Sequence, residues 1–226
     1  MRLFYSRLLL FISFLLLTAC TSRSKKQSDR NVPDSPEIHN ANNENKISPE
    51  GLSENGDLII ASWNIQDLGR TKDRLELVQI AQIIKDFDVV ALQEVVAKDP
   101  AGVQAVARIA DELNRMGSKW NYSVSEATKS PSAYISERYA FLWKTSKVKL
   151  INKPYLDKEL EVLCNREPYI ARFQVKSGEE TFSVINYHSR KHEDHPEDEI
   201  IHFKEYPNRL KSDRLFIVGD FNLNEE

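Results

Sequence analysis

The chain has 226 residues, of which 41% are hydrophobic and 29% charged, and its formal net charge is −3. This length allows one domain of about 150 to 200 residues with additional segments, and the slight acidic excess excludes a strongly basic protein that binds polyanions through its overall field. With only two cysteines, Cys20 and Cys164, the fold must depend on its hydrophobic core and not on disulfides.

The first 20 residues have the features of an export signal. Two arginines flank a short N-terminal segment, the apolar stretch LLLFISFLLL (8–17) follows, and LTAC ends at Cys20. The apolar stretch is too short to cross a bilayer as a helix. LTAC resembles the bacterial lipobox, which implies cleavage after residue 19 and lipidation of Cys20. An ordinary signal peptide with an unrelated thiol is the alternative.

The lipobox resemblance predicts the organisation of the rest of the chain. Residues 1–19 would be a lipoprotein signal peptide, and residues 20–56 would be the lipidated cysteine and a disordered tether. The tether contains no aromatic residue and few large apolar ones, so it cannot bury enough surface to offset its ordering entropy. A folded domain is expected over residues 57–226. The protein would then be exported and lipid-anchored in a bacterial cell envelope, at the outer membrane or on the periplasmic side.

Beyond residue 56, short apolar runs predict the strands of a sheet. Four of them predict buried strands: LIIASWNI (58–65), VVALQEVV (89–96), FSVINYHS (182–189) and LFIVGDFN (215–222). RYAFLWK (138–144) and YIARFQV (169–175) show more alternation, which predicts partly exposed strands.

The first predicted helix lies between the first two predicted strands. Leu75, Val78, Ala81 and Ile84 recur at a helical spacing, and Thr71 or Asp73 could cap its N-terminus.

Two further helices are predicted. One runs from about Ala101 to Met116 and is ended by Gly117. The other starts at Pro196 and should end or kink near Pro207, with the charged residues of 191–214 on its exposed face. The order of elements favours an α/β or α+β layered domain.

The four predicted buried strands all end in polar residues, namely Asn64, Glu94, His188 and the pair Asp220 and Asn222. Any one of these could simply mark where a strand reaches the surface. Together they predict a site, because ligands of layered α/β proteins bind at strand ends and carboxylate and amide oxygens suit Mg²⁺ or Ca²⁺. The spacing of His188, His192 and His195 could suggest zinc, but the acidic residues between them favour a solvated loop.

The motifs WNIQ, LQEV, SERYAFLWK, REPY, NYHS and GDFN, in that order, resemble the deoxyribonuclease I branch of the endonuclease/exonuclease/phosphatase superfamily. The resemblance covers about residues 59–222. It implies an α/β fold, a four-layer α/β sandwich in which two packed sheets are flanked by helices. It also implies a catalytic groove along one edge.

The resemblance implies a role for each matching residue. Glu94 would be a metal ligand, with Asn64 helping to hold the metal and the phosphate. His188 would be a general acid/base histidine, and Glu137 would be its carboxylate partner. The cofactor implied is Mg²⁺, with Ca²⁺ as a possibility.

Four more residues carry over from these motifs. Asp220 and Asn222 would orient the attacking water and stabilise the scissile phosphate, and Arg166 would contact a DNA phosphate. Tyr134 would be a groove tyrosine, although one extra residue separates it from Glu137. Val96 stands where this branch places a DNA-contacting arginine.

The function implied is metal-dependent hydrolysis of DNA by a membrane-anchored, monomeric endonuclease. The alternatives are a phosphodiesterase or phosphatase acting on a phospholipid or small phosphoester, and a non-catalytic surface lipoprotein that binds DNA or a partner. Members of this branch continue beyond GDFN to a Ser-Asp-His motif. The chain is therefore expected to lack its last strands, and its activity to be impaired.

Overall fold

The structure, a computed structural model, describes residues 57–212 and 214–223. The predicted signal peptide, Cys20 and the predicted tether lie outside these residues. No helix in the described part of the chain is long and apolar enough to cross a membrane.

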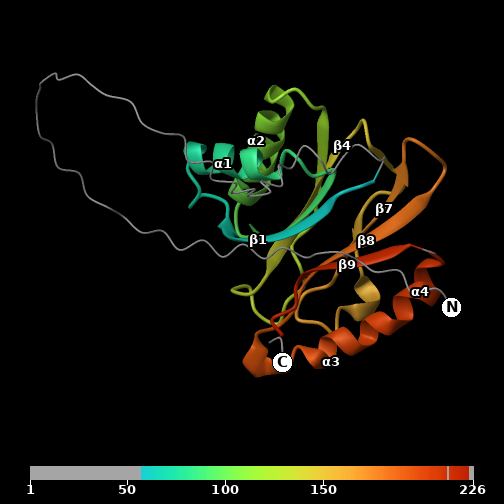
Figure 1. Ribbon diagram of the computed structural model, residues 1–226. Coiled ribbons are helices and arrows are strands. Elements are labelled where there is room, and N and C mark those ends of the chain that lie inside the picture. The colour runs from blue at the N-terminus through green and yellow to red at the C-terminus, as the bar shows by residue number, and fades with distance from the viewer. Residues whose placement is uncertain (1–56, 213, 224–226) are drawn as a thin grey trace, which may run out of the picture. The chain divides into compact units, whose positions relative to one another are not determined.

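Two sheets form the centre of the domain (Figure 1). The first has the order β1-β2-β4-β3, from β1 (Ile60–Leu68), β2 (Val89–Val96), β4 (Glu137–Lys144) and β3 (Trp120–Val124). The second has the order β5-β7-β8-β9, from β5 (Val148–Leu150), β7 (Tyr169–Val175), β8 (Thr181–His188) and β9 (Leu215–Asp220), and the short β6 (Tyr155–Leu156) pairs with β7. β1 is parallel to β2 and β8 is parallel to β9, so the C-terminal ends of each pair lie together.

Helices cover the outer face of each sheet (Figure 1). α1 (Arg74–Ile84) and α2 (Ala101–Arg115) pack on the first sheet. α3 (Glu197–Ile200), the 3-10 helix η4 (Ile201–Glu205) and α4 (Tyr206–Leu210) lie against the second, and the short turns η2 (Lys158–Leu160) and η3 (His192–Asp194) lie in loops. The predicted four-layer α/β sandwich is confirmed.

Side-chain alternation along the strands divides the core between these layers. On β2, Val90 and Leu92 face the helices of the first sheet, whereas Val89 and Ala91 face the second sheet. Buried aromatic rings fill the space between the sheets; one example is the stack of Phe141 on β4 with Tyr169 on β7, whose ring centroids lie 5.2 Å apart. The sheets therefore hold each other in a fixed orientation through close packing.

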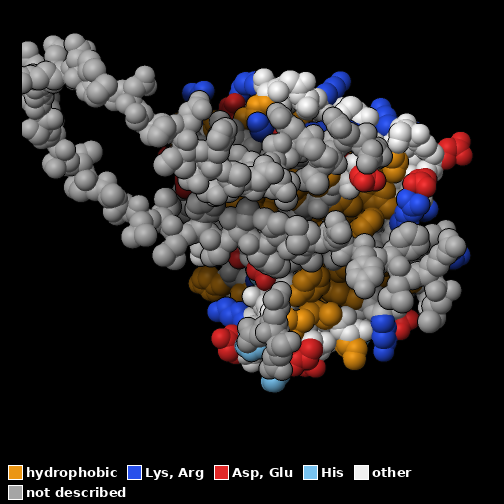
Figure 2. Space-filling model, in the orientation of Figure 1, with side chains coloured by type: hydrophobic (Ala, Val, Ile, Leu, Met, Phe, Trp, Pro, Cys, Tyr) orange, Lys and Arg blue, Asp and Glu red, His pale blue; other side chains and the backbone are white. Residues whose placement is uncertain are grey.

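The predicted strands are all present, but two were assigned the wrong exposure. β4 was expected to be partly exposed, yet its residues from Tyr139 to Trp143 are all buried because helices cover one face and the second sheet covers the other. β9 was expected to be buried, yet it lies at the edge of its sheet and Phe216 is 43% exposed. Figure 2 shows hydrophobic side chains at the surface in the region of β9. The short strands β3, β5 and β6 were not predicted.

The predicted helices are also present, with two corrections. Asp73 caps α1 in a reciprocal capping box with Glu76, as one of the two predicted caps. Leu75, however, was placed on the apolar face and is 72% exposed; the buried face is Leu77, Ile80, Ala81 and Ile84.

α2 ends next to Gly117, whose φ is 103°. The third predicted helix begins after Pro196 and is interrupted by η4, and Pro207 occupies the first turn of α4. The expectation that its charges are all exposed is wrong for Glu199, whose carboxylate is buried beside Tyr187 and Arg190.

Candidate active site

The alternation that fills the inter-sheet core also directs the predicted polar residues into the space between the sheet ends. Tyr139 and Val218 pack between the sheets. Glu137 and Asp220 are each two residues away from one of them on the same strand, so they lie on the same face. His188 follows Asn186 on the corresponding face of β8. Side chains of the two sheets therefore point toward one another at this edge.

Glu94 reaches the same edge through a bulge in β2. The register between β2 and β4 shifts between Leu92 and Val95, and Glu94 has a left-handed φ of 59°. Leu92 and Val95 both face α1 and α2, which regular alternation does not allow for residues three apart. The bulge is thus what turns the Glu94 carboxylate toward the end of β1.

Asn64 joins the two carboxylates of the site. Its Nδ2 donates to Glu94 Oε1 and to Asp220 Oδ2, both at 2.9 Å. The backbone N–H of Asp67 donates to the other Glu94 oxygen at 3.3 Å. Asn64 Oδ1 is buried and has no hydrogen-bond partner among the described residues.

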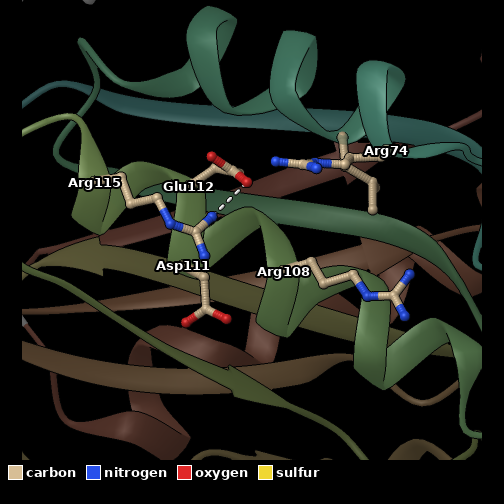
Figure 3. Close-up of a pocket in the computed structure, with 6 residues that line it drawn as sticks. Arg74, Arg108, Asp111, Glu112 and Arg115 are labelled. Atoms are coloured by element: carbon tan, nitrogen blue, oxygen red, sulfur yellow. Dashed lines mark hydrogen bonds and ion pairs between the residues drawn. The ribbon is translucent and has the colours of Figure 1, made fainter.

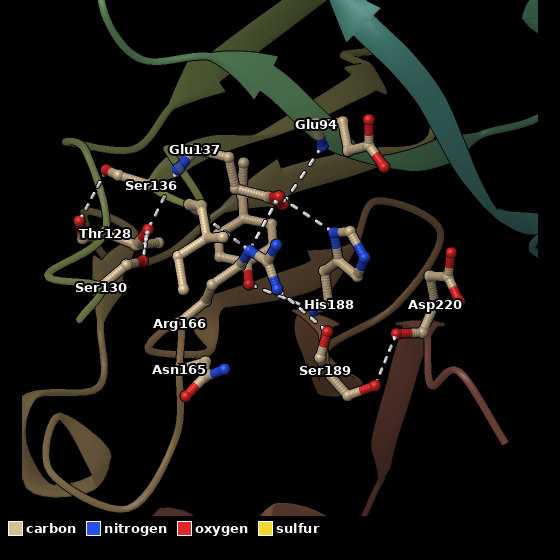
Figure 4. A network of polar contacts seen from close by, with 12 residues as sticks. Glu94, Thr128, Ser130, Ser136, Glu137, Asn165, Arg166, His188, Ser189 and Asp220 are labelled. Atoms are coloured by element: carbon tan, nitrogen blue, oxygen red, sulfur yellow. Dashed lines mark hydrogen bonds and ion pairs between the residues drawn. The ribbon is translucent and has the colours of Figure 1, made fainter. Parts of the chain in front are cut away.

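Glu137 is the centre of a second group (Figure 4). Its Oε2 lies 2.9 Å from His188 Nδ1 and 3.0 Å from Arg166 Nε, and its Oε1 accepts from the backbone N–H of Glu94 at 3.2 Å. Glu137 and His188 are both buried, at 6% and 7% exposure. A carboxylate this close to Nδ1 fixes the orientation of the ring and leaves Nε2 as the nitrogen available to a substrate.

Tyr139 holds the backbone of His188 through a hydrogen bond. The backbone N–H of His188 donates to the Tyr139 hydroxyl at 3.1 Å. Burial, with a smaller contribution from the charge of Glu137, raises the pKa of Tyr139 well above its ordinary value. The hydroxyl therefore remains protonated over the physiological range and acts as a fixed hydrogen-bonding group.

Asp220 and Asn222 are held against the end of β8. The backbone N–H of Ser189 donates to the Asp220 carbonyl at 3.0 Å, and the backbone N–H of Asn222 donates to Asp220 Oδ1 at 3.1 Å. The Asn222 amide donates to the Ser189 carbonyl at 3.4 Å, with a left-handed φ of 48° at Asn222. Asp220 thus contacts both Asn64 and the segment that follows His188.

The two predicted substrate-binding residues have different surroundings. Arg166 is largely buried, and its guanidinium donates to the carbonyls of Ile135 and Ser189, both at 3.0 Å, as well as contacting Glu137. Its structural partners are therefore internal, and its contact with a DNA phosphate stays a prediction. Tyr134 is 88% exposed, and Lys98 lies 4.3 Å from its ring centroid.

A buried polar connection between the sheets was not predicted from the sequence. Gln93 Nε2 donates to Asn186 Oδ1 at 2.6 Å and to Ser62 Oγ at 3.0 Å. Asn186 Nδ2 donates in turn to the carbonyls of Leu92 and Ala140. Gln93 and Asn186 are completely buried, and each is within two residues of a predicted site residue. The sequence signal for this connection was the presence of two polar residues, Gln93 and Asn186, inside apolar strand segments.

The side chains at this edge fit a hard divalent cation. Asn64 Oδ1 is a buried oxygen without a partner among the described residues, on the amide whose nitrogen donates to both carboxylates. Mg²⁺ in proteins commonly uses one or two carboxylates and retains several waters. In residues 57–212 and 214–223, no group of three or more His, Cys, Asp or Glu could hold a metal. The fit therefore depends on the amide oxygen and on water as well as on Glu94 and Asp220.

Two pockets are lined by residues of α1, α2 and the loops that precede these helices. One, of about 250 Å³, lies between α1 and α2 and is lined by Arg74, Arg108 and Arg115 with Asp111 and Glu112 (Figure 3). The other, of about 350 Å³, lies between the β1–α1 loop and the start of α2. Neither is lined by a predicted site residue.

Residues 61–225 match the family described as Endonuclease/Exonuclease/phosphatase family. A curated deoxyribonuclease of Thioalkalivibrio sp. (strain K90mix) is 31% identical over 135 residues, which are 58% of this chain and 35% of that protein. The chain thus spans about a third of the length of this relative.

Solved structures show the same fold. An endonuclease/exonuclease/phosphatase family protein from Bacteroides thetaiotaomicron has a TM-score of 0.54 at 16% identity, covering 73% of this chain and 63% of that one. The mannosyl-6-phosphatase Bt3783 of the same organism has a TM-score of 0.54 at 15% identity, with 75% and 67% covered. TDP2 of D. rerio, complexed with a single-strand DNA product, has a TM-score of 0.51 at 18% identity, with 74% and 62% covered.

Proposed function

This chain belongs to the endonuclease/exonuclease/phosphatase family. We propose that it is a hydrolase of the phosphodiesterase or nuclease type, and specifically a divalent-metal-dependent endonuclease acting on DNA. The observation that carries the proposal is the buried contact of 2.9 Å between Glu137 Oε2 and His188 Nδ1. Glu137 also accepts from the backbone N–H of Glu94, and His188 is the register partner of Asp220 on β9. Phosphodiester hydrolysis requires a proton donor together with groups that stabilise added negative charge.

His188 handles the proton in this proposal. Glu137 holds Nδ1, so Nε2 is the atom that can donate to or accept from an oxygen of the phosphodiester. Arg166 holds Glu137 in turn and fixes the loop beyond β8 through the Ser189 carbonyl. Arg166 therefore serves in positioning, and its proposed contact with a DNA phosphate would be additional.

Asp220 and Asn222 are proposed to orient the attacking water and the scissile phosphate. Asp220 is suited to accept a proton from water because one of its oxygens is shared with Asn64 and the other accepts only a backbone N–H. Asn222 could redirect its amide to the phosphate, since its contact to Ser189 is long at 3.4 Å.

Glu94, Asn64 and Asp220 are proposed to hold Mg²⁺, or Ca²⁺ in its place. The bound cation would supply charge neutralisation at the non-bridging oxygens and polarisation of the scissile bond. Asn64 would then have two roles. Its Nδ2 donates to both carboxylates, and its Oδ1 is a further oxygen that could contact the cation.

The choice of DNA is supported by the deoxyribonuclease relative and not by the fold. The fold of this chain is shared by a mannosyl-6-phosphatase and by a protein complexed with single-strand DNA. The deoxyribonuclease is 31% identical to this chain over 135 residues. Because the chain spans only part of that relative, the activity, substrate and monomeric state of the whole protein remain proposals.

We also propose that the domain is exported and attached to the cell envelope through Cys20. The support is the sequence of residues 1–20, with its basic start, short apolar stretch and LTAC. Metabolic labelling with a radioactive fatty acid would test this. Label that is retained by a Cys20→Ser variant would contradict it.

A plasmid-nicking assay tests the enzymatic proposal. Supercoiled DNA should be converted to the open circle with Mg²⁺ or Ca²⁺ and remain supercoiled with EDTA. Glu94→Ala and His188→Ala should each reduce the rate by about two to four orders of magnitude. Exposed Glu179→Ala is a matched control that should retain the rate. Nicking that persists in EDTA, or in both site variants, would refute the mechanism.

A further inference from the structure

A basic pocket lies beside the candidate active site, between the β1–α1 loop and the N-terminal half of α2. It has a volume of about 350 Å³, and its lining includes Arg70, Lys72 and Arg108 together with Gly69, Ala101 and Gln104. No acidic side chain lines it among the described residues. Three cationic groups around one concave surface make a local positive site in a chain whose net charge is −3.

Two of the three cations are available to a ligand. The side chains of Lys72 and Arg108 make no hydrogen bond or ion pair within the described part of the chain. Figure 3 shows the Arg108 guanidinium turned away from Asp111 and Glu112 on the same helix. Arg70 is paired with Asp99 at 3.1 Å but is 81% exposed, so that pair is weak.

The pocket adjoins the proposed metal ligands through close backbone packing. A Cβ atom at Gly69 would lie 2.8 Å from Val96 Cγ2, and one at Gly102 would lie 2.3 Å from the Val96 carbonyl oxygen. The β1–α1 loop and the start of α2 therefore both close on Val96, two residues after Glu94. The loop follows Leu68 at the end of β1, and the backbone N–H of the preceding residue, Asp67, donates to Glu94 Oε2 at 3.3 Å.

We propose that this pocket binds a backbone phosphate of the DNA strand at a distance from the scissile bond, so that it positions the substrate along the edge of the sheets. The inference rests on the proposed function, because it assigns a second contact to the same substrate. A protein with no overall positive field needs such local sites to hold a polyanion. Guanidinium and ammonium groups are the usual donors to phosphate oxygens.

The position of the pocket favours DNA over an anionic membrane surface. Its lining residue Gly69 packs against Val96, two residues after Glu94, and its concave lining suits one phosphate group. DNA presents a phosphate every few ångströms along the strand, so a phosphate is available near the edge once another occupies the site.

Binding of a short fluorescent DNA duplex in EDTA tests the inference without cleavage. In Lys72→Gln/Arg108→Gln, we expect the Kd to rise roughly 3- to 30-fold. The slope of log K against log salt, between about 50 and 200 mM, should become shallower by about two. The matched control is Lys149→Gln/Lys176→Gln, which removes the same charge from exposed positions on the second sheet and should keep both values. Thermal melts of both variants establish that they are folded.

The outcomes separate this inference from the proposed function. A full chain that nicks plasmid DNA, but whose salt slope is the same in both double variants, would overturn the pocket alone. A chain that neither binds nor nicks DNA would overturn both. Loss of binding to vesicles containing phosphatidylglycerol, with DNA binding intact, would assign the pocket to a membrane surface and overturn the inference.

Discussion

Asn64 on β1 donates a hydrogen bond of 2.9 Å to Asp220 on β9, and this contact joins the ends of the two sheets. The same amide nitrogen donates to Glu94, so one nitrogen atom contacts both carboxylates. The candidate metal site therefore exists only when the two sheets are packed together.

Removal of the Asn64 amide should lower stability more in EDTA than in Mg²⁺, which can still bind Glu94 and Asp220. In Asn64→Ala, Glu94 and Asp220 lose their shared donor, and we expect the free energy of unfolding in EDTA to fall by about 1 to 3 kcal/mol. Saturating Mg²⁺ should restore part of this loss, because a ligand that binds only the folded state stabilises it. Urea unfolding with EDTA or Mg²⁺ measures the effect. The exposed Asn121→Ala serves as the control and should show no added dependence on Mg²⁺.

Glu137 and His188 should behave as one unit in catalysis. Each alanine variant is expected to lower the nicking rate by about two to four orders of magnitude, and the double variant should cost little more than the worse single one. Single-turnover rates of the four proteins give the coupling. Strictly additive losses would show that the 2.9 Å contact does not act in the reaction.

The Gln93–Asn186 connection should lock the sheets together. Gln93→Leu leaves the Asn186 carbonyl oxygen without its side-chain donor, and Asn186→Leu leaves Gln93 with only Ser62, so each should lower the free energy of unfolding by about 1 to 3 kcal/mol. The double variant should lose less than the sum, because the bond between Gln93 and Asn186 is lost only once. A urea double-mutant cycle measures this. Additive losses would argue against a direct energetic link.

Gly219 should be intolerant of any side chain. Its φ is 151°, and a Cβ atom there would lie 1.7 Å from the Tyr187 carbonyl oxygen. We expect Gly219→Ala to push β9 from β8 and to lower the free energy of unfolding by at least about 2 kcal/mol. Gly178→Ala, at an open turn with nothing within 4 Å of the added atom, is the matched control. Equal stabilities of the two variants would show that β9 is not fixed at this point.

The Cys164 thiol should be unreactive in the folded protein. Burial raises its pKa to about 12, above an ordinary value of 9.0, so the reactive thiolate is scarce at pH 8. In a Cys20→Ser background, a chromogenic disulfide reagent should label Cys164 slowly in buffer and rapidly in concentrated urea. Rapid labelling without urea would place the thiol at an accessible position.

The strands were predictable because each is a short run of β-branched and aromatic residues, and β2 and β7 begin and end at the predicted residues. It was harder to predict which faces of the strands and helices are buried against other layers. Leu75 fits the apolar period of α1 yet is exposed, and β4 was expected to have an exposed side yet is covered on both. Periodicity reports an element's own pattern, but burial depends on what packs against it.

The roles of individual site residues divide in the same way. Four site residues were predicted because they are polar and end a strand, namely Asn64, Glu94, His188 and Asp220. The structure brings all four to one edge. Arg166 was expected to face a phosphate, whereas its partners in the structure are Glu137 and two carbonyls, because the loop before β7 folds onto the end of β8.

The sequence by itself therefore determined six of the strands, the family that they build and the polar residues at the ends of four of them, since these follow from local composition and order. Only the tertiary structure decided that Glu137 reaches His188 and that Asn64 reaches Asp220, residues that lie 51 and 156 positions apart in the chain. The physical reason is that the packing of two sheets through their aromatic core sets the distance between their ends, and no local pattern encodes that distance.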